Sequence, residues 1–232
     1  MEPVVKVYGP AMSWNIARVL VSLEESGVNY ELVAVDFAAA EHKSPAHLGR
    51  NPFGQVPVLE DGDFCLWALI TYIVYVYATE SRAITKYICR KYKPELLGVG
   101  NLEGSAMVYV WLEVEAHQYR PLIEAILMEV RIRPIFGQRV DERAVEENID
   151  KLKKVLDVYE SRLSSSKYLA GDFISLADLN HVSTMLCLGI TIYISVLDMY
   201  PHVRAWWDDL KGRPAARKVS DLMHMSVKND LK

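Results

Sequence analysis

The first sixty residues alternate between strand-like and helix-like segments, and this spacing limits the fold more than any other feature. Residues 4–8 are β-branched and aromatic and end at the breaker pair Gly9-Pro10. Apolar residues recur at helical spacing over residues 16–23, and a second strand-like run covers residues 30–35. A strand, a helix and a strand at this spacing predict a βαβ unit with two parallel strands side by side.

A proline inside the next strand-like run restricts that segment further. The turn at residues 51–54 leads into residues 55–59, and a turn at residues 60–63 leads to another apolar run, so the pair is interpreted as a hairpin. Pro57 cannot donate a hydrogen bond to a neighbouring strand, and one of two equally weighted interpretations is an edge strand with a trans proline. The alternative is a cis bond between Val56 and Pro57, which would leave the Val56 backbone free to pair with an extended ligand.

The rest of the chain has the period of helices. A helix is expected to begin near residue 80, and one Pro and two Gly within residues 93–100 indicate a linker. Two long helices are expected after it, one directly behind the linker and one over residues 141–163. The predicted fold is a small α/β domain over residues 1–92, the linker, and an all-α domain over residues 101–232.

Local signals place further helix ends. Ser175 and Asp178 form a variant of the capping box, with Asp in place of the more usual Glu or Gln, and they predict a helix start. Asp208 is expected at the end of one late helix and Pro214 at the start of the next.

Composition excludes several classes of protein. With a formal net charge of -4 and no basic stretch, the chain does not fit a nucleic-acid binder. The three cysteines are odd in number, widely spaced and outside any CxxC pattern, so neither a disulfide framework nor a metal site is expected, and a cytoplasmic location is favoured. No signal peptide is recognised. The uncharged apolar run over residues 64–78 is short for a membrane span, which needs about 20 residues, so a membrane role is not expected.

Ser13 stands between the first strand and the first helix, and two interpretations are open. Ser is strongly preferred as a helix N-cap, where its oxygen accepts a hydrogen bond from the first free amides, and position alone favours this role. The functional interpretation is that the hydroxyl points to a ligand at the positive end of the helix. No G-x-S-x-G nucleophile elbow is present, so hydrolase chemistry is not expected.

Six motifs follow one another in order along nearly the whole chain. They are Met12-Ser-Trp-Asn15, Glu41-His-Lys43, Asn51-Pro-Phe-Gly-Gln-Val-Pro57, Glu80-Ser-Arg-Ala-Ile84, Lys167-Tyr-Leu-Ala-Gly-Asp172 and Ser175-Leu-Ala-Asp-Leu-Asn-His181. In this order and spacing the chain resembles the plant phi-class glutathione transferases. The resemblance implies a thioredoxin-like first domain, a helical second domain and a homodimer, with glutathione as co-substrate and no cofactor.

The resemblance assigns the chemistry to Ser13, which would hold the sulfur of glutathione as thiolate. A free thiol has a pKa near 8.5, so only about a few per cent is ionised at neutral pH. A hydroxyl donor and a helix N-terminus both stabilise the anion, and each unit of lowered pKa corresponds to about 1.4 kcal/mol. Arg18, one turn further along the helix, is expected to give structural or electrostatic support.

Three pairs of residues are implied to hold the three parts of the tripeptide. They are His42 and Lys43 for the glycine carboxylate, Gln55 and the backbone of Val56 beside a cis Pro57 for the middle, and Glu80 and Ser81 for the γ-glutamyl end. Five apolar residues are candidates for the electrophile pocket, although apolar residues at helical spacing are usually ordinary core. They are Met12, Trp14, Phe37, Leu122 and Ile126.

One segment departs from the family pattern. Residues 68–79, from Ala68 to Thr79, separate the hairpin from Glu80, whereas the family passes almost directly from the strand to the Glu-Ser motif. The segment has no charge, Gly or Pro and is rich in β-branched and aromatic residues. It is interpreted as an insertion that threatens the γ-glutamyl end of the site.

Two functions follow as expectations. The first is a glutathione transferase that conjugates the thiolate to hydrophobic electrophiles in detoxification or stress response. Because the active position carries Ser rather than Cys, peroxide reduction is a further expected activity and thiol–disulfide exchange is not. The alternative is a non-catalytic carrier of apolar ligands, in case the insertion disrupts the glutathione site. A third interpretation is a membrane-associated protein anchored through residues 64–78.

Overall fold

The chain folds as two compact units. The computed structural model describes residues 4–67 and 81–230, so the predicted insertion at residues 68–79 lies outside the described part. One unit comprises the described residues up to Pro94 together with those from Pro214 onward, and the other comprises Glu95–Arg213. The predicted domain boundaries stay predictions. They placed the last helix in the helical domain, whereas it belongs to the unit that contains the sheet.

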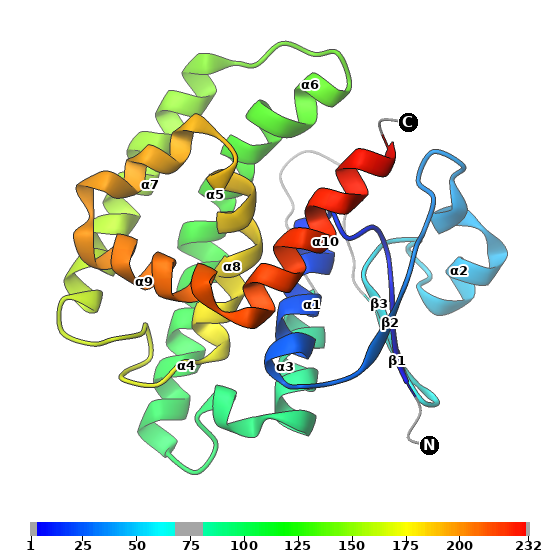
Figure 1. The fold of residues 1–232 in the computed structure, drawn as a ribbon, viewed down its shortest axis with the longest axis horizontal. Coiled ribbons are helices and arrows are strands. Elements are labelled where there is room, and N and C mark those ends of the chain that lie inside the picture. Colours follow the sequence, from blue (N-terminus) through cyan, green and yellow to red (C-terminus); the bar gives the residue numbers. More distant parts are fainter. Residues whose placement is uncertain (1–3, 68–80, 231–232) are drawn as a thin grey trace. The chain divides into compact units, whose positions relative to one another are not determined.

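A four-stranded mixed sheet forms the centre of the first unit, in the order β2-β1-β3-β4 (Figure 1). β1 (Val5–Tyr8) pairs in parallel with β2 (Tyr30–Val33), and β3 (Val58–Asp61) pairs antiparallel with both β1 and β4 (Phe64–Trp67). The predicted βαβ unit and the predicted hairpin are confirmed. The second strand ends at Val33, earlier than the predicted residue 35.

Helices cover both faces of this sheet. α1 (Trp14–Glu25) and α3 (Ser81–Tyr92) lie on one side of it and pack against each other, and α10 (Pro214–Asp230) also packs on α1 (Figure 1). The predicted apolar face of α1 is confirmed, because its four members are completely buried; they are Ile16, Val19, Leu20 and Leu23. Each such side chain contributes about 1.5–3 kcal/mol when removed from water, so this face fixes α1 against its neighbours.

A cluster around Asp61 fastens the hairpin to α3. The Asp61 carboxylate accepts hydrogen bonds from the Tyr87 hydroxyl at 2.9 Å, the Lys91 ammonium at 2.7 Å and the Tyr92 hydroxyl at 2.7 Å. Burial opposes ionisation of Asp61, but these three donors outweigh it and lower the pKa of the carboxyl group. The charged form therefore anchors the C-terminal half of α3 to β3.

The other face of the sheet carries a short segment that bears several predicted site residues. A 3-10 turn, η1 (Glu41–Lys43), leads into α2 (Pro45–Arg50), which lies on the side of the sheet opposite α1 (Figure 1). Ser44 caps α2, because its hydroxyl accepts a hydrogen bond from the His47 amide at 3.2 Å. Pro45 follows at the first helical position, where a missing N–H costs nothing.

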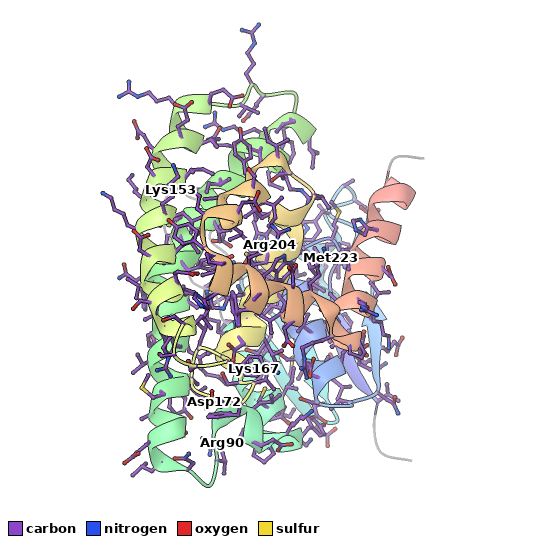
Figure 2. All side chains as sticks on the ribbon, turned by 60° about the vertical axis from the view of Figure 1, so that its left-hand side comes forward. Arg90, Lys153, Lys167, Asp172, Arg204 and Met223 are labelled. Atoms are coloured by element: carbon purple, nitrogen blue, oxygen red, sulfur yellow. The ribbon has the colours of Figure 1, made fainter. Side chains whose placement is uncertain are left out.

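The second unit is helical, as predicted. Its α-helices are α4 (Leu102–Val114), α5 (Arg120–Leu127), α6 (Arg133–Ile135), α7 (Glu142–Leu163), α8 (Leu176–Gly189) and α9 (Pro201–Gly212). Asn101 and Asp141 cap α4 and α7, each accepting a backbone N–H, which confirms the two predicted starts. The last turn before α9 is 3-10, η5 (Ile192–Met199). Figure 2 marks Lys153 on α7 and Arg204 on α9, which form ion pairs with Asp150 and Asp198, each at 2.9 Å.

The long helix expected behind the linker is interrupted twice. Two π-helical turns, η3 (Glu115–Tyr119) and η4 (Met128–Ile132), separate α4, α5 and α6. Each π turn is followed by a proline close behind it, Pro121 or Pro134. A proline ring clashes with the carbonyl of the residue four positions earlier, and a wider turn moves that carbonyl out of the way. Within the predicted linker, Pro94–Leu97 forms a 3-10 turn, η2.

A buried carboxylate holds the helical unit together. Asp178 is completely buried and accepts hydrogen bonds from the Ser175 amide at 2.9 Å, the Ser175 hydroxyl at 2.8 Å, the Leu169 amide at 2.9 Å and the Trp206 indole at 3.0 Å. The predicted capping box is thus confirmed. Burial raises the pKa of Asp178, and the four donors act against that rise. The predicted end of α9 at Asp208 is wrong: the helix continues to Gly212, because Leu210 is still part of the core.

Candidate functional site

Two chain segments meet at one end of the sheet. Tyr8, the last residue of β1, pairs with Val58, the first residue of β3, so the segments after β1 and before β3 lie at the same end of the sheet. Gly9 has φ +142°, a conformation that side chains rarely adopt, and a Cβ on it would lie 3.1 Å from the Val56 Cβ. The same Cβ would clash with Ile16 Cδ1, so glycine is what lets the backbone in front of Ser13 run this close to α1 and Val56.

Ser13 occupies the N-cap position of α1 with a hydroxyl that caps nothing. Its backbone is extended, with φ -71° and ψ 124°, and its carbonyl accepts the first helical hydrogen bond from Ala17 at 2.8 Å. The side chain, however, makes no hydrogen bond to the first turn, and the residue is half-buried. The capping role that position alone favours is therefore not used. The hydroxyl instead stands beside the free amides and the positive end of the helix dipole.

The Val56–Pro57 peptide bond is cis. Of the two alternatives left open by the sequence, the structure has the cis form, and β3 starts only after the proline, at Val58. The backbone N–H and C=O of Val56 make no hydrogen bond within residues 4–67 and 81–230. A backbone donor and acceptor thus stand unused next to the segment that carries Ser13, which suits an extended peptide ligand.

His42 and Lys43 lie against the turn that leads to Gln55. Lys43 donates from its ammonium to the Phe53 carbonyl at 2.9 Å. Gly54 has φ +62°, and a Cβ there would lie 2.6 Å from the His42 carbonyl and 2.9 Å from the Lys43 ammonium. The turn can approach this closely only because it carries a glycine. Residues 42–43 and 53–55, which α2 separates in the sequence, therefore form one surface.

The His42 ring is held by stacking rather than by polar contacts. Its centroid lies 4.5 Å from that of Phe37, with the planes 25° apart. The Nδ1 atom is buried and has no hydrogen-bond partner among the described residues. Burial, followed by the neighbouring charges of Lys43 and His47, lowers the pKa of His42. At neutral pH the ring is uncharged, so the positive charge of this surface comes from Lys43.

Two residues that the sequence analysis did not single out fix the Gln55 carbonyl. It accepts a hydrogen bond from His47 Nε2 at 2.9 Å and one from Asn51 Nδ2 at 3.0 Å. His47 is 3% exposed and Asn51 is fully buried. Asn51 lies inside a recognised motif, so its position gave a signal. His47 gave none, because a histidine in a short polar helix is usually a surface residue.

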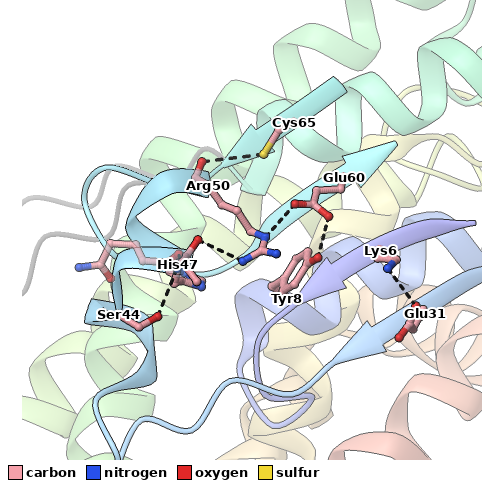
Figure 3. A network of polar contacts seen from close by, with 10 residues as sticks. Lys6, Tyr8, Glu31, Ser44, His47, Arg50, Glu60 and Cys65 are labelled. Atoms are coloured by element: carbon pink, nitrogen blue, oxygen red, sulfur yellow. Dashed lines mark hydrogen bonds and ion pairs between the residues drawn. The ribbon is translucent and has the colours of Figure 1, made fainter. Parts of the chain in front are cut away.

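The end of α2 is tied to the sheet by a charged network (Figure 3). Arg50 donates from Nε to Glu60 at 2.8 Å, and its guanidinium lies 4.5 Å from the centroid of the Tyr8 ring. The Tyr8 hydroxyl donates to the other oxygen of Glu60 at 2.6 Å. Burial opposes ionisation of Glu60, but the donors Tyr8 and Arg50 lower its pKa overall. The network keeps α2, and with it His47, in place over β3 and β1.

Ser81 is placed differently from Ser13. It is fully buried at the start of α3, and its hydroxyl oxygen accepts a hydrogen bond from the Arg18 guanidinium at 3.1 Å. Arg18 is also fully buried and lies 3.4 Å from the Asn15 side-chain oxygen. Arg18 therefore links α1 to α3, in line with the support expected of it. Glu80, the partner of Ser81 in the predicted γ-glutamyl pair, lies outside the described residues.

The five candidates for the electrophile pocket fall into two groups. Met12 and Trp14 are half-buried next to Ser13, and Phe37 is 39% exposed against His42. Leu122 is half-buried on α5 in the other unit, whereas Ile126 is completely buried there. Full burial is what ordinary core predicts for Ile126. The pocket assignment stays a prediction for all five residues.

Neither a metal site nor a membrane span is found in the described parts of the chain. No group of three or more His, Cys, Asp or Glu side chains there could hold a metal ion. No helix within residues 4–67 and 81–230 is long and apolar enough to cross a membrane. Of the three cysteines, Cys65 is exposed on β4, and Cys89 and Cys187 are buried.

Comparison with known families matches both units. Residues 3–90 match the glutathione S-transferase N-terminal domain, and residues 122–214 match the glutathione S-transferase C-terminal domain. Among curated relatives, the chain is 58% identical to the probable glutathione S-transferase GSTF2 of Oryza sativa subsp. japonica, over 94% of this chain and 96% of the relative. It is also 58% identical to glutathione S-transferase 1 of Zea mays, over 96% of this chain and 98% of the relative.

Solved structures agree. A glutathione S-transferase I bound with lactoylglutathione has a TM-score of 0.88 and 57% identity, covering 95% of this chain and all (100%) of that one. A glutathione S-transferase I from maize in complex with an atrazine–glutathione conjugate has a TM-score of 0.87 and 57% identity, covering 96% and 99% of the two chains. The comparisons give no support for the predicted insertion at residues 68–79.

Proposed function

We propose a mechanism for this chain, which belongs to the plant phi-class glutathione S-transferases. It is a glutathione transferase with a thioredoxin-like domain and a helical domain, and it conjugates glutathione to electrophiles. The observation that carries the mechanism is the Ser13 hydroxyl, which stands at the N-terminus of α1 without capping it. In our proposal this hydroxyl donates a hydrogen bond to the sulfur of glutathione.

The hydroxyl and the helix end act on the protonation of the thiol. A hydrogen bond to the charged form and the positive end of a helix both lower a thiol pKa, which is near 8.5 in water. The thiol releases its proton to solvent and binds as thiolate. The sulfur then attacks the electrophilic carbon, a C–S bond forms, and the leaving group departs with the electron pair of its bond. Ser13 keeps its own proton throughout and forms no covalent bond.

The rest of the tripeptide lies along the surface from residue 42 to residue 57. Lys43 supplies the charge that meets the glycine carboxylate, and His42 donates to it as a neutral ring. The unused N–H and C=O of Val56 pair with the peptide backbone, as one more strand would, and the Gln55 side chain adds a polar contact. Glu80 and Ser81 are proposed for the γ-glutamyl end, although Ser81 is already engaged by Arg18.

Further parts of the proposal rest on the family rather than on the geometry. We propose a homodimer, a cytoplasmic location, and an electrophile pocket lined by Met12, Trp14, Phe37, Leu122 and Ile126. The solved relative that carries an atrazine–glutathione conjugate makes chlorotriazines a sensible first class of substrate. The carrier hypothesis depended on the insertion, and the comparisons give no support for that insertion.

The test is a conjugation assay on the purified chain with glutathione and an aryl chloride, beside the variant Ser13→Ala. We expect the wild type to form the thioether and release chloride, and we expect the variant to be slower by about two orders of magnitude. A wild type without activity toward aryl chlorides, epoxides and chlorotriazines would contradict the function. Equal rates in both proteins would contradict the mechanism.

A further inference from the structure

His47 lies outside every motif that pointed to the family, yet it is bonded directly to a residue of the proposed glutathione site. It is 3% exposed, in a helix whose other residues are mostly at the surface. Its Nε2 lies 2.9 Å from the Gln55 carbonyl oxygen. A carbonyl oxygen can only accept, so Nε2 carries a proton and donates.

The Gln55 carbonyl is fixed from two sides. His47 donates from α2, and Asn51 donates from the turn at 3.0 Å, so both lone pairs of the oxygen are engaged. Two hydrogen bonds to one carbonyl define the plane of the peptide that joins Gln55 to Val56. This peptide is trans, because within the described residues the Val56–Pro57 bond alone is cis. In a trans peptide the N–H points opposite to the C=O. The Val56 N–H is therefore directed away from His47 and Asn51.

In the proposed function this N–H donates to the peptide backbone of glutathione. Val56 makes no backbone hydrogen bond within the described residues, and it lies beside the segment that carries Ser13. A donor that rotates freely binds a ligand more weakly than one held in place, because it loses conformational entropy when the ligand binds. Holding the peptide plane before the ligand arrives removes that cost.

The neighbouring structure keeps His47 itself in position. The His47 amide donates to the Ser44 hydroxyl at 3.2 Å, which fixes the start of α2. At the other end of the helix, Arg50 is bound to Glu60 of β3 and lies over Tyr8 of β1 (Figure 3). The ring of His47 thus connects a helix that is fastened to the sheet with the peptide that faces the ligand.

We infer that His47 is a positioning residue for glutathione, one that acts through the Gln55 carbonyl to hold the Val56 amide ready for the tripeptide. This inference rests on the proposed function. His47 touches neither the sulfur nor the electrophile, so it affects the binding of glutathione and not the chemical step. Without His47, the peptide between Gln55 and Val56 is no longer held in one orientation. We expect the affinity for glutathione to fall about five- to tenfold, the free energy of about one hydrogen bond.

The experiment compares four proteins by steady-state kinetics and thermal unfolding. His47→Leu removes the donor, His47→Gln keeps an amide donor, and Arg50→Met loosens the same helix without touching Gln55. For His47→Leu we expect the KM for glutathione to rise about five- to tenfold, with kcat and the KM for the electrophile within about twofold of the wild type. For His47→Gln we expect the KM for glutathione to stay within about twofold of the wild type.

The control decides between positioning and general loosening. Arg50→Met should lower Tm and raise the KM for glutathione less than His47→Leu does, because His47 and its own hydrogen bond to the Gln55 carbonyl remain. The inference is overturned if His47→Leu has the KM of the wild type, or if Arg50→Met raises that KM as much as His47→Leu does. Should His47→Leu not fold, a folded His47→Gln with a tenfold higher KM would overturn it as well. An inactive wild type would instead contradict the proposed function, so the two failures are distinguishable.

Discussion

A serine stands at the N-terminal end of two helices of the first unit, and the structure uses the two hydroxyls in opposite ways. Ser13 is half-buried at the start of α1 and caps nothing. Ser81 is fully buried at the start of α3 and accepts a hydrogen bond from Arg18. Ser13 precedes its helix as the N-cap and its hydroxyl makes no bond to the first turn, whereas Ser81 is the first residue of its helix and its hydroxyl oxygen is engaged by a buried arginine.

The same contrast extends along the proposed site. The Val56 backbone and the His42 Nδ1 atom have no hydrogen-bond partner among the described residues, whereas the Gln55 carbonyl has two. Leaving a polar group without a partner costs stability, about 1–3 kcal/mol when it is buried. Free groups gathered at one end of a sheet therefore indicate a binding role, and engaged groups beside them indicate a supporting one.

The largest effect is expected for Ser13→Ala. Removing one donor to a developing or bound anion lowers kcat by about 10²- to 10³-fold. Stability should change by less than about 0.5 kcal/mol, since no capping bond is lost. Steady-state kinetics and urea unfolding measure both quantities.

Ser175→Ala is the matched control, because Ser175 is also an N-cap but has its hydroxyl bonded to Asp178 at 2.8 Å. It should lower stability by about 1–2 kcal/mol and leave kcat unchanged in the folded protein. If Ser13→Ala were the less stable of the two and still fully active, the contrast between free and engaged serines would be lost.

The next largest effect is expected for Ser81→Ala, and it should fall on stability. The variant removes a buried acceptor of the charged Arg18 side chain, which costs about 1.5–3 kcal/mol. We also expect a higher KM for glutathione, as the proposed γ-glutamyl role requires. Thr85→Val on the same helix, which loses a neutral hydrogen bond to the Arg82 carbonyl, should cost less. A stability of Ser81→Ala equal to that of the wild type would contradict the engaged role.

A smaller effect is expected for Lys43→Met. The ammonium is exposed, so its attraction to a carboxylate is screened and contributes about 1 kcal/mol, a roughly fivefold rise in the KM for glutathione. Raising the salt concentration should raise the KM for glutathione of the wild type and barely change that of the variant. Lys153→Met, on the exposed face of α7, controls for the change in net charge and should leave this KM unaltered.

The smallest effect is expected for the pH dependence of His42. Burial lowers the pKa of this ring in the free protein, so it is neutral at pH 7. A bound carboxylate favours the charged form and raises the pKa, so binding takes up a proton and strengthens as the pH falls toward 6. We expect S-hexylglutathione, whose sulfur does not titrate, to bind about two- to threefold more tightly at pH 6 than at pH 8. The variant His42→Gln should lose this dependence; an unchanged dependence would exclude His42 from the glycine end.

The sequence predicted the fold of the first unit well, because its signals are local. The spacing of apolar residues predicts each strand and helix from a few consecutive positions. Gly9 and Pro57 restrict the backbone at the positions where they stand. The outcome at Ser13 could not be read in this way. Position favours a cap, and only the three-dimensional structure shows that the hydroxyl is left unused.

Other features depended on contacts that no local pattern encodes. The side of the sheet on which α10 packs depends on which apolar face meets it, and a helical period does not name its partner. The π turns before Pro121 and Pro134 replace one continuous helix, although both prolines were visible. His47 was missed because its burial comes from the way α2 lies over Gln55.

The most direct measurement of the role of Ser13 is the pKa of bound glutathione. The ultraviolet absorbance of the thiolate is titrated in the presence of the wild type and of Ser13→Ala. With the wild type we expect the thiol to titrate at least about one unit below its free value near 8.5, which corresponds to about 1.4 kcal/mol of preferential thiolate binding. With Ser13→Ala we expect most of this shift to disappear. The same lowered pKa in both complexes would contradict the assignment of thiolate stabilisation to the Ser13 hydroxyl.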